Sequence, residues 1–210
     1  MIVAIDGPAG AGKSTVARRL AQRLGFRYLD TGAMYRALTW LAREQGIDPE
    51  DGQALHELAN ENPIELEPSG RVTIGGHDVT TAIRSAEIDR VVPIVARHPA
   101  VRRVMRATQS AMADVGNTVI EGRDIGTVVA KDATVKVYLD ADPAVRAGRR
   151  QAERPEIGAD ALVTDLRERD ARDAERTLVA DDALLIDTTD LEIDDVVSRI
   201  EQLVRERLPA

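Results

Sequence analysis

The sequence predicts an α/β fold, in which five parallel strands form a sheet flanked by helices and a small antiparallel sheet lies in an insertion. Two observations lead to this prediction. Short apolar runs alternate with helical patterns at both ends of the chain, which is typical of a parallel sheet covered on both faces. Between Ile64 and Thr80, alternating stretches are broken by Pro-Ser-Gly and Gly-Gly, which is typical of a hairpin or meander.

Five short apolar runs are the predicted strands. They are Ile2–Ile5, Phe26–Leu29, Thr118–Ile120, Val135–Leu139 and Ala183–Ile186. Continuous apolar runs of this length are typical of strands that are buried on both faces. After the first run, Val16, Leu20 and Leu24 recur every four residues. This stripe predicts an amphipathic helix over Lys13–Leu24, with Gly25 as its C-cap.

Apolar periodicity also predicts the helices of the middle of the chain. We expect Thr31 to cap a helix that continues to about Gln45. A helical pattern from Ile83 to Val115 contains Pro93 and Pro99. Because proline cannot donate a backbone hydrogen bond inside a helix, we expect two helices here, with a break near His98-Pro99.

The predicted elements divide a single domain of 210 residues into a core, an insertion and a lid. The core covers about residues 1–35, 116–152 and 177–210, and ends in a helix over about Ile193–Leu208. The insertion covers about residues 36–115 and contains the antiparallel sheet. The stretch Ala152–Arg176 is highly charged and has few apolar residues, so we expect a short, mobile helical lid over about residues 153–176.

Composition and charge exclude several classes of function. The absence of cysteine excludes disulfides and thiolate zinc sites, and is compatible with a reducing compartment. No apolar run reaches the roughly 18–20 residues of a membrane span. A net charge of −8 and an aromatic fraction of 2% argue against nucleic-acid binding. We therefore expect a cytoplasmic protein that acts on small molecules, without nucleic-acid or membrane partners. We also expect a monomer, because the sequence shows no evident exposed apolar helix.

The segment IDGPAGAGKST (Ile5–Thr15) fits the pattern G-x-x-x-x-G-K-S/T, which is typical of a P-loop. It has the required context, a buried strand before it and an amphipathic helix after it. Its glycines let backbone N–H groups approach phosphate oxygens, Lys13 reaches the outer phosphates, and the Ser14 hydroxyl can ligate Mg²⁺. The residues expected to hold the phosphates are Gly7, Pro8, Ala9, Gly10, Ala11, Gly12, Lys13, Ser14 and Thr15. The alternative is a glycine-rich turn without a ligand.

Three arginine-bearing segments are candidates for the acceptor side of a phosphoryl-transfer site. They are LDTGAMYR (Leu29–Arg36), IEGRDIGTVV (Ile120–Val129) and RERDARDAER (Arg167–Arg176). Arginine forks complement the charge that spreads over phosphoryl oxygens during transfer. Each segment also has a simpler structural interpretation, respectively a capped helix with a solvated arginine, a surface turn with a local ion pair, and a solvated ladder of ion pairs.

Together with GPAGAGKST, VTTAIRS (Val79–Ser85) and the strand segment DATVKVYLDA, these three segments resemble bacterial cytidylate kinase over essentially the whole chain. The resemblance implies a P-loop nucleoside monophosphate kinase with a core, an acceptor-binding insertion and a lid. It also implies transfer of a phosphoryl group from ATP, with Mg²⁺, to CMP or dCMP. One position departs from the family pattern, because Pro93 stands where relatives tend to carry a hydroxyl residue in the base-reading helix.

The resemblance also implies roles for individual residues. Lys13, Arg123, Arg169 and Arg172 would be the catalytic charges, the last two from the closing lid. The acceptor would be bound by Thr31, Arg36, Arg102, Arg123, Asp124, Asp173 and Arg176, with Arg36 and Arg123 on its phosphate. Within this set, Arg102, Asp124 and Arg176 would read the cytosine, and Asp173 the sugar hydroxyls. Arg149 and Arg150 would lie near the donor adenine.

Two alternatives and one assignment remain open at the level of the sequence. A kinase for UMP or another small phosphate acceptor fits everything except a cytosine-reading role for Asp124. A nucleotide-binding switch would need a base-reading N-K-x-D segment, and the chain has only AKDA (Ala130–Ala133). Glu121 is the candidate for a second carboxylate near Mg²⁺, either in direct contact or through water.

Overall fold

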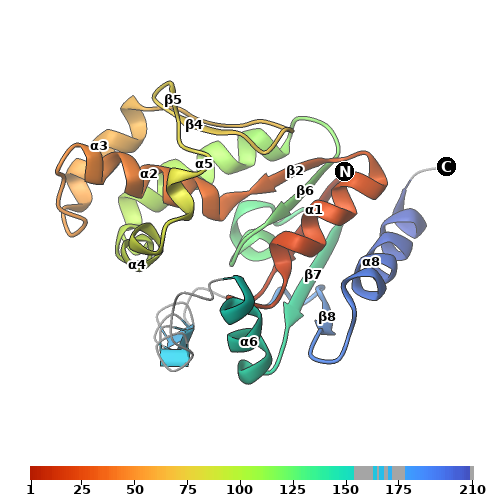
Figure 1. Ribbon diagram of the computed structural model, residues 1–210. Coiled ribbons are helices and arrows are strands. Elements are labelled where there is room, and N and C mark those ends of the chain that lie inside the picture. Colours follow the sequence, from red (N-terminus) through yellow and green to blue (C-terminus); the bar gives the residue numbers. More distant parts are fainter. Residues whose placement is uncertain (154–162, 165, 168–169, 172–177, 209–210) are drawn as a thin grey trace. The chain divides into compact units, whose positions relative to one another are not determined.

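The computed structural model describes residues 1–153, 163–164, 166–167, 170–171 and 178–208. The chain forms two compact units (Figure 1). One consists of Met1–Tyr28 and Ala113–Ala210, and the other of Leu29–Met112. We call them the sheet unit and the insertion unit. No helix in the described part of the chain is long and apolar enough to cross a membrane.

The main sheet has five strands in the order β2-β6-β1-β7-β8. They are β1 (Ile2–Asp6), β2 (Arg27–Asp30), β6 (Thr118–Glu121), β7 (Val135–Asp140) and β8 (Leu184–Asp187). β1 pairs in parallel with both β6 and β7, and β7 pairs in parallel with β8. Each strand overlaps one of the apolar runs, so the predicted parallel sheet is confirmed.

Helices cover the sheet within the sheet unit. They are α1 (Lys13–Leu24), α6 (Pro143–Glu153) and α8 (Ile193–Arg207), together with the short π-helical turn η2 (Ile125–Val129). α1 and α8 lie side by side, and Val16 and Ile200 share a buried cluster with Ile5 of β1 (Figure 1). Because side chains alternate along a strand, the neighbouring Asp6 points to the opposite face. There η2 contacts β1.

The helices of the insertion unit enclose a second apolar core. They are α2 (Thr31–Glu44), α3 (Gly52–Glu61), the short 3₁₀ turn η1 (Ala82–Arg84), α4 (Ala86–Val95) and α5 (Pro99–Ala113). Met34 and Leu38 of α2 pack with Leu55 of α3 and Met105 of α5 in this core. The predicted break at His98-Pro99 is confirmed, but Pro93 lies inside α4 rather than interrupting it. α3 was not among the predicted helices.

The predicted antiparallel sheet is confirmed in the insertion unit. β3 (Ile64–Leu66), β4 (Val72–Ile74) and β5 (His77–Asp78) form it in this order. Ile64 and Ile74 lie opposite each other, and both are buried in the apolar core of the unit. The sheet therefore packs one face against the helices.

The cap of α2 differs from the prediction. The side chain of Asp30, not that of Thr31, accepts a hydrogen bond from the backbone N–H of Ala33 at 2.8 Å. Thr31 is the first residue of the helix itself, and it is buried. An N-cap residue has an extended backbone, and Asp30 has φ −89° and ψ 94°. The helix consequently begins one residue after the carboxylate that ends β2.

Candidate active site

The loop between β1 and α1 has a backbone that only glycine permits at its first position. Gly7 has a φ of 146°, and a Cβ there would lie 2.1 Å from the carbonyl oxygen of Leu139. The loop therefore rests directly on the backbone of β7. At the other end of the loop, Gly12 has a φ of 87°, and a Cβ there would have no atom within 4 Å. The loop is thus packed tightly where it leaves β1 and open where it enters α1.

The open end of the loop has the features of an anion site. No side chain caps α1 in the described structure, so side-chain oxygens leave its first N–H groups available to a ligand. Lys13, the first residue of the helix, is buried, and its Nζ donates to the carbonyl of Pro8 at 2.7 Å. Ser14 and Thr15 are exposed. A phosphate chain fits this arrangement, because it supplies the oxygens that the helix N-terminus lacks and the space beside Gly12 admits it.

Mg²⁺ is compatible with the same end of the loop. The exposed hydroxyl of Ser14 can supply one oxygen, and Mg²⁺ in phosphoryl-transfer sites takes most of its other ligands from phosphates and water. Within the residues that the structure describes, no group of three or more acidic or histidine side chains could hold a metal by itself. A metal here therefore depends on the phosphates for most of its ligands.

Asp6 ends β1 and joins it to the segment after β6. Its Oδ1 accepts the N–H of Ile125 and its Oδ2 the N–H of Gly126, both at 2.8 Å. Desolvation by burial raises the pKa of Asp6 to about 6, although the two N–H groups and Lys13 act in the opposite direction and Asp124 acts in the same one. Folding therefore makes this carboxyl harder to ionise than it is in an unfolded chain.

This raised pKa predicts how stability depends on pH. Between about pH 4 and pH 6 the folded chain holds a proton on Asp6 that the unfolded chain has lost, so the contribution of Asp6 favours folding at low pH and declines as the pH rises. A change from 3.8 to about 6 corresponds to at most about 3 kcal/mol. We expect the difference in free energy of unfolding between wild type and Asp6→Asn to change by up to this amount between pH 4 and pH 7, measured by urea unfolding. A constant difference would contradict the prediction.

Arg123, a predicted site residue from the segment after β6, contacts the phosphate loop directly. Its Nη1 donates to the carbonyl of Gly7 at 2.5 Å. It follows β6, whose carboxyl end lies at the same edge of the sheet as the phosphate loop. Asp124 is the next residue and stands at the N-cap position of η2. The sheet unit thus brings Lys13, Arg123 and Asp124 to one edge of the sheet.

The two arginines predicted near the donor base are on α6. Arg149 donates from Nη1 to the hydroxyl of Thr188 at 3.0 Å and from Nη2 to its carbonyl at 2.6 Å. The Thr188 hydroxyl lies 3.4 Å from the carbonyl of Ala11, so Arg149 holds the turn after β8 beside the phosphate loop. Arg150 lies on the same helix and is partly buried.

Arg146 also contacts the phosphate loop, but the sequence did not single it out. Its buried side chain donates to the carbonyls of Ala141 and Ala9 at 3.0 and 3.2 Å, and pairs with Asp170 at 2.7 Å. Its backbone leaves no room for a Cβ on Gly10, which would lie 2.9 Å from the Arg146 carbonyl oxygen. The only signal in the sequence was its place three residues before Arg149 and four before Arg150, one turn along the same helix.

In the insertion unit, Arg36 is held by the carboxylate that caps α2. Arg36 Nη2 lies 2.9 Å from Asp30 Oδ2, and Arg84 Nη2 lies 3.1 Å from the same oxygen. Burial raises the pKa of Asp30, but the two guanidinium groups and the Ala33 N–H outweigh it and hold the pKa below its usual value. Arg84 belongs to the segment VTTAIRS, for which the sequence predicted no role, and its contact with Asp30 distinguishes it.

Arg36 has one feature that suits an anion. Its Nε is buried and has no hydrogen-bond partner in the described structure. A Cβ on Gly32 would lie 3.1 Å from Arg36 Nη1, so the glycine leaves space for the guanidinium over the first turn of α2. Thr31 lies in that same turn, and Arg102 lies on α5 of this unit.

Four predicted residues fall outside the described part of the chain. They are Arg169, Arg172, Asp173 and Arg176.

Glu121, the candidate carboxylate, ends β6 and is buried, and its Oε1 accepts a hydrogen bond from the hydroxyl of Tyr28 at 3.0 Å. This contact fixes the direction of the carboxylate within the sheet unit.

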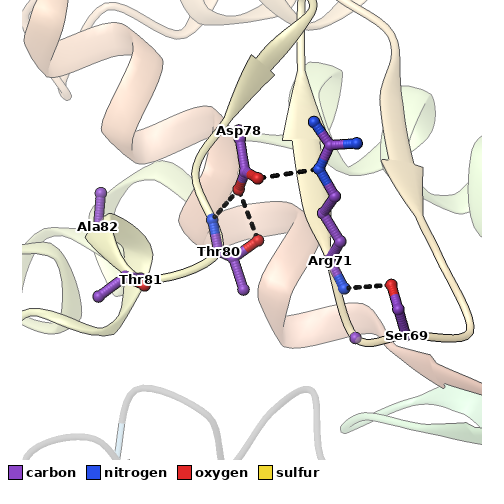
Figure 2. A pocket seen from close by; sticks show the side chains of 7 residues that line it. Ser69, Arg71, Asp78, Thr80, Thr81 and Ala82 are labelled. Carbon is purple, nitrogen blue, oxygen red and sulfur yellow. Dashed lines mark hydrogen bonds and ion pairs between the residues drawn. The ribbon is translucent and has the colours of Figure 1, made fainter.

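A polar cavity of about 680 Å³ lies beside the hairpin of the insertion unit (Figure 2). It is lined by Ser69, Gly70, Arg71, Asp78, Thr80, Thr81 and Ala82. Figure 2 shows Asp78 between Thr80 and Arg71, which donate to it at 2.7 and 2.9 Å. These hydrogen bonds, those of Thr80 first, lower the pKa of Asp78 to about 2. None of the predicted site residues lines this cavity, and its polar groups largely satisfy one another.

Comparisons with known proteins agree with one another. The family model described as cytidylate kinase matches residues 3–206. The cytidylate kinase of Geobacillus sp. (strain WCH70) is 47% identical over 98% of this chain and 97% of that protein. The bifunctional pantoate ligase/cytidylate kinase of Prochlorococcus marinus (strain MIT 9303) is 46% identical over 99% of this chain, which spans 45% of that longer protein. A shikimate kinase structure from Bacteroides thetaiotaomicron, at 15% identity with a TM-score of 0.53 over 98% of each chain, shares the fold.

Proposed function

Since this chain belongs to the cytidylate kinase family, we propose that it transfers the γ-phosphoryl group of ATP to CMP or dCMP, giving ADP and CDP or dCDP. The observation that carries the proposal is the contact between Arg123 and Gly7. It sets a guanidinium beside a loop that is open to phosphate. A kinase needs cationic groups for the donor phosphates and for the acceptor phosphate close together, whereas a loop that only binds a nucleotide does not.

On this proposal the phosphate loop binds ATP and neutralises the charge that develops during transfer. The N–H groups at the start of α1 and the Lys13 ammonium would contact the donor phosphates, and Ser14 would hold Mg²⁺. The metal supplies charge neutralisation between the phosphates when it is bound. The attacking oxygen belongs to an ionised phosphate, so no general base is required and catalysis consists of positioning and charge stabilisation.

The acceptor would be bound by the residues that the family resemblance assigns to it. Arg36 and Arg123 would hold its phosphate, and the partnerless Nε of Arg36 supports an anion there. Arg84, which shares Asp30 with Arg36, is a further candidate for the same role. Arg102 and Asp124 would read the cytosine, because a carboxylate complements the 4-amino group and an arginine complements the N3 and O2 acceptors.

The remaining assignments rest on the sequence alone. Thr31 would contact the acceptor, and Arg149 and Arg150 would lie near the donor adenine. Arg169, Arg172, Asp173 and Arg176 would belong to a lid that closes over the transferring group and excludes water. The insertion would carry most of the acceptor site. The enzyme would act in the cytoplasm as a monomer, without nucleic-acid or membrane partners.

The test is an assay of ADP release with ATP, Mg²⁺ and each nucleoside monophosphate in turn. We expect fast turnover with CMP and dCMP and at least about tenfold lower kcat/KM with UMP, since uracil presents an oxygen to Asp124 where cytosine presents an amino group. Equal use of UMP would keep the reaction and remove the role of Asp124 in base reading. The absence of transfer to every nucleotide, with ATP binding retained, would contradict the proposed function.

A further inference from the structure

The turn η2 begins without a cap of its own. Asp124 stands at its N-cap position, but the Asp124 side chain makes no capping hydrogen bond. The first N–H groups of a helical turn need acceptors from elsewhere. In this chain they find them across the sheet, because the Asp6 carboxylate accepts the N–H of Ile125 with one oxygen and that of Gly126 with the other.

A second contact joins the same two segments in the opposite direction. The guanidinium of Arg123 donates to the carbonyl of Gly7, the residue that follows Asp6. In each of these two contacts, a side chain of one segment is hydrogen-bonded to the backbone of the other segment. Asp6 is only 5% exposed, and the N–H groups of Ile125 and Gly126 meet it in a buried environment. Loss of either link would leave a buried polar group unsatisfied.

From these contacts we infer that Asp6 is a positioning residue for phosphoryl transfer, which fixes the segment carrying Arg123 and Asp124 against the phosphate loop; the inference rests on the proposed function. Asp6 itself touches neither the donor nor the acceptor on this account. Its carboxylate replaces the N-cap that Asp124 does not provide. A displacement of about 1 Å between reacting groups can lower a rate about 100-fold, so a rigid link between donor loop and acceptor arginine affects turnover directly.

The chemistry of the link requires a carboxylate rather than an amide. Two oxygens can accept two N–H groups, whereas asparagine has one oxygen and turns an NH₂ toward the second N–H. The charged and titratable groups near Asp6 include Lys13 of α1, Asp124 before η2 and Tyr138, which lies beside Asp6 in the next strand. The aliphatic part of Lys136, also of β7, packs beside Gly126 on the same side as Asp6 Oδ2. Lys13 stabilises the ionised carboxylate, and Asp124 opposes ionisation.

The test compares Asp6→Asn with Asp140→Asn. Asp140 ends the neighbouring strand β7 and is exposed, and its side-chain Oδ1 accepts the N–H of Ala141 at 2.8 Å. We expect Asp6→Asn to lower kcat with CMP about 10- to 100-fold and to raise KM for CMP, while KM for ATP stays within about twofold. We expect Asp140→Asn to behave as wild type. The ratio of the wild-type kcat to the Asp6→Asn kcat should fall toward one below about pH 6, because Asp6 is then protonated in the wild type and has lost its second acceptor oxygen. Titration of the substrates affects both proteins equally, so it cancels in this ratio.

Amide hydrogen exchange of Ile125 and Gly126 gives a readout that needs no substrate. We expect faster exchange at both amides in Asp6→Asn than in Asp140→Asn. If wild type transfers phosphoryl to no nucleotide, the proposed function fails while this measurement still tests the link. Unchanged exchange, or an equal rise in KM for ATP and CMP with kcat intact, would overturn the inference. If Asp6→Asn does not fold, the comparison uses wild type alone, with the exchange of the Ile125 and Gly126 amides measured at pH 5 and pH 7 and corrected for intrinsic rates. Equal protection of these amides at the two pH values would overturn the inference.

Discussion

Replacing Lys13 by methionine is expected to lower kcat for phosphoryl transfer about 10²- to 10³-fold. The ammonium lies at the first residue of α1, where the helix N-terminus and the open side of Gly12 form the anion site. Its charge would act on the transferring group, where negative charge accumulates in the transition state, and methionine keeps most of the length of the side chain. The measurement is single-turnover transfer from ATP to CMP at saturating substrate, so that weaker ATP binding is not mistaken for slower chemistry.

Lys131→Met is the matched control for this variant. Lys131 is exposed and lies in the turn that follows η2, so its loss removes the same charge from the protein without touching the anion site. We expect it to turn over as wild type does. A Lys13→Met enzyme that retained a tenth or more of the wild-type kcat would show that Lys13 serves the structure of the loop, through its bond to Pro8, rather than the reaction.

Replacing Asp30 by alanine is expected to give the largest loss of stability, about 3 kcal/mol or more. The side chain is 9% exposed and it caps α2, and its removal leaves the guanidinium of Arg36 in a nearly buried position without its partner. Arg84 is 47% exposed, so water screens much of its share. For a chain of this size we expect the melting temperature to fall by about 6–12 °C, measured by circular dichroism.

Asp51→Ala separates the cap from the ion pairs. Asp51 caps α3 in the same way, by accepting the N–H groups of Gln53 and Ala54, but it is exposed and forms no ion pair with an arginine in the described structure. Its loss is expected to destabilise the protein by about 1 kcal/mol, which is the usual value for an N-cap. Equal losses for the two variants would show that the arginines add nothing to the role of Asp30 as a cap.

The parts of this site that the sequence predicted are local in the chain. The phosphate loop, the strand before it and the helix after it are set by residues within one turn or one strand of each other, so spacing and periodicity reveal them. The cap of α2 was misplaced by one residue because aspartate and threonine are both good caps, and the choice depends on how β2 ends.

The parts that the sequence did not reveal are contacts between distant residues. Asp6 and Ile125 are 119 residues apart, and Arg84 and Asp30 are 54 residues apart. No local pattern signals such pairs, because each partner is chosen by the way the strands are ordered in the sheet or the helices packed in the insertion unit. Arg146, which lies on the same helix as two predicted residues, was missed because its function depends on the carbonyl of Ala9, 137 residues away.

On the proposed function, the ion pair between Asp30 and Arg36 neutralises the guanidinium that would receive the phosphate of the acceptor. Asp30 occupies the guanidinium that an incoming phosphate would contact, and it holds that side chain in a fixed orientation over Gly32. On the proposed function, binding of the acceptor is then an exchange of anions rather than the capture of an anion by an unpaired cation. Such an exchange reduces the electrostatic free energy gained when the acceptor phosphate binds, and it also reduces the side-chain entropy lost. The Asp30 carboxylate then competes with the bound phosphate for Arg36 at every turnover, which favours rapid departure of the product.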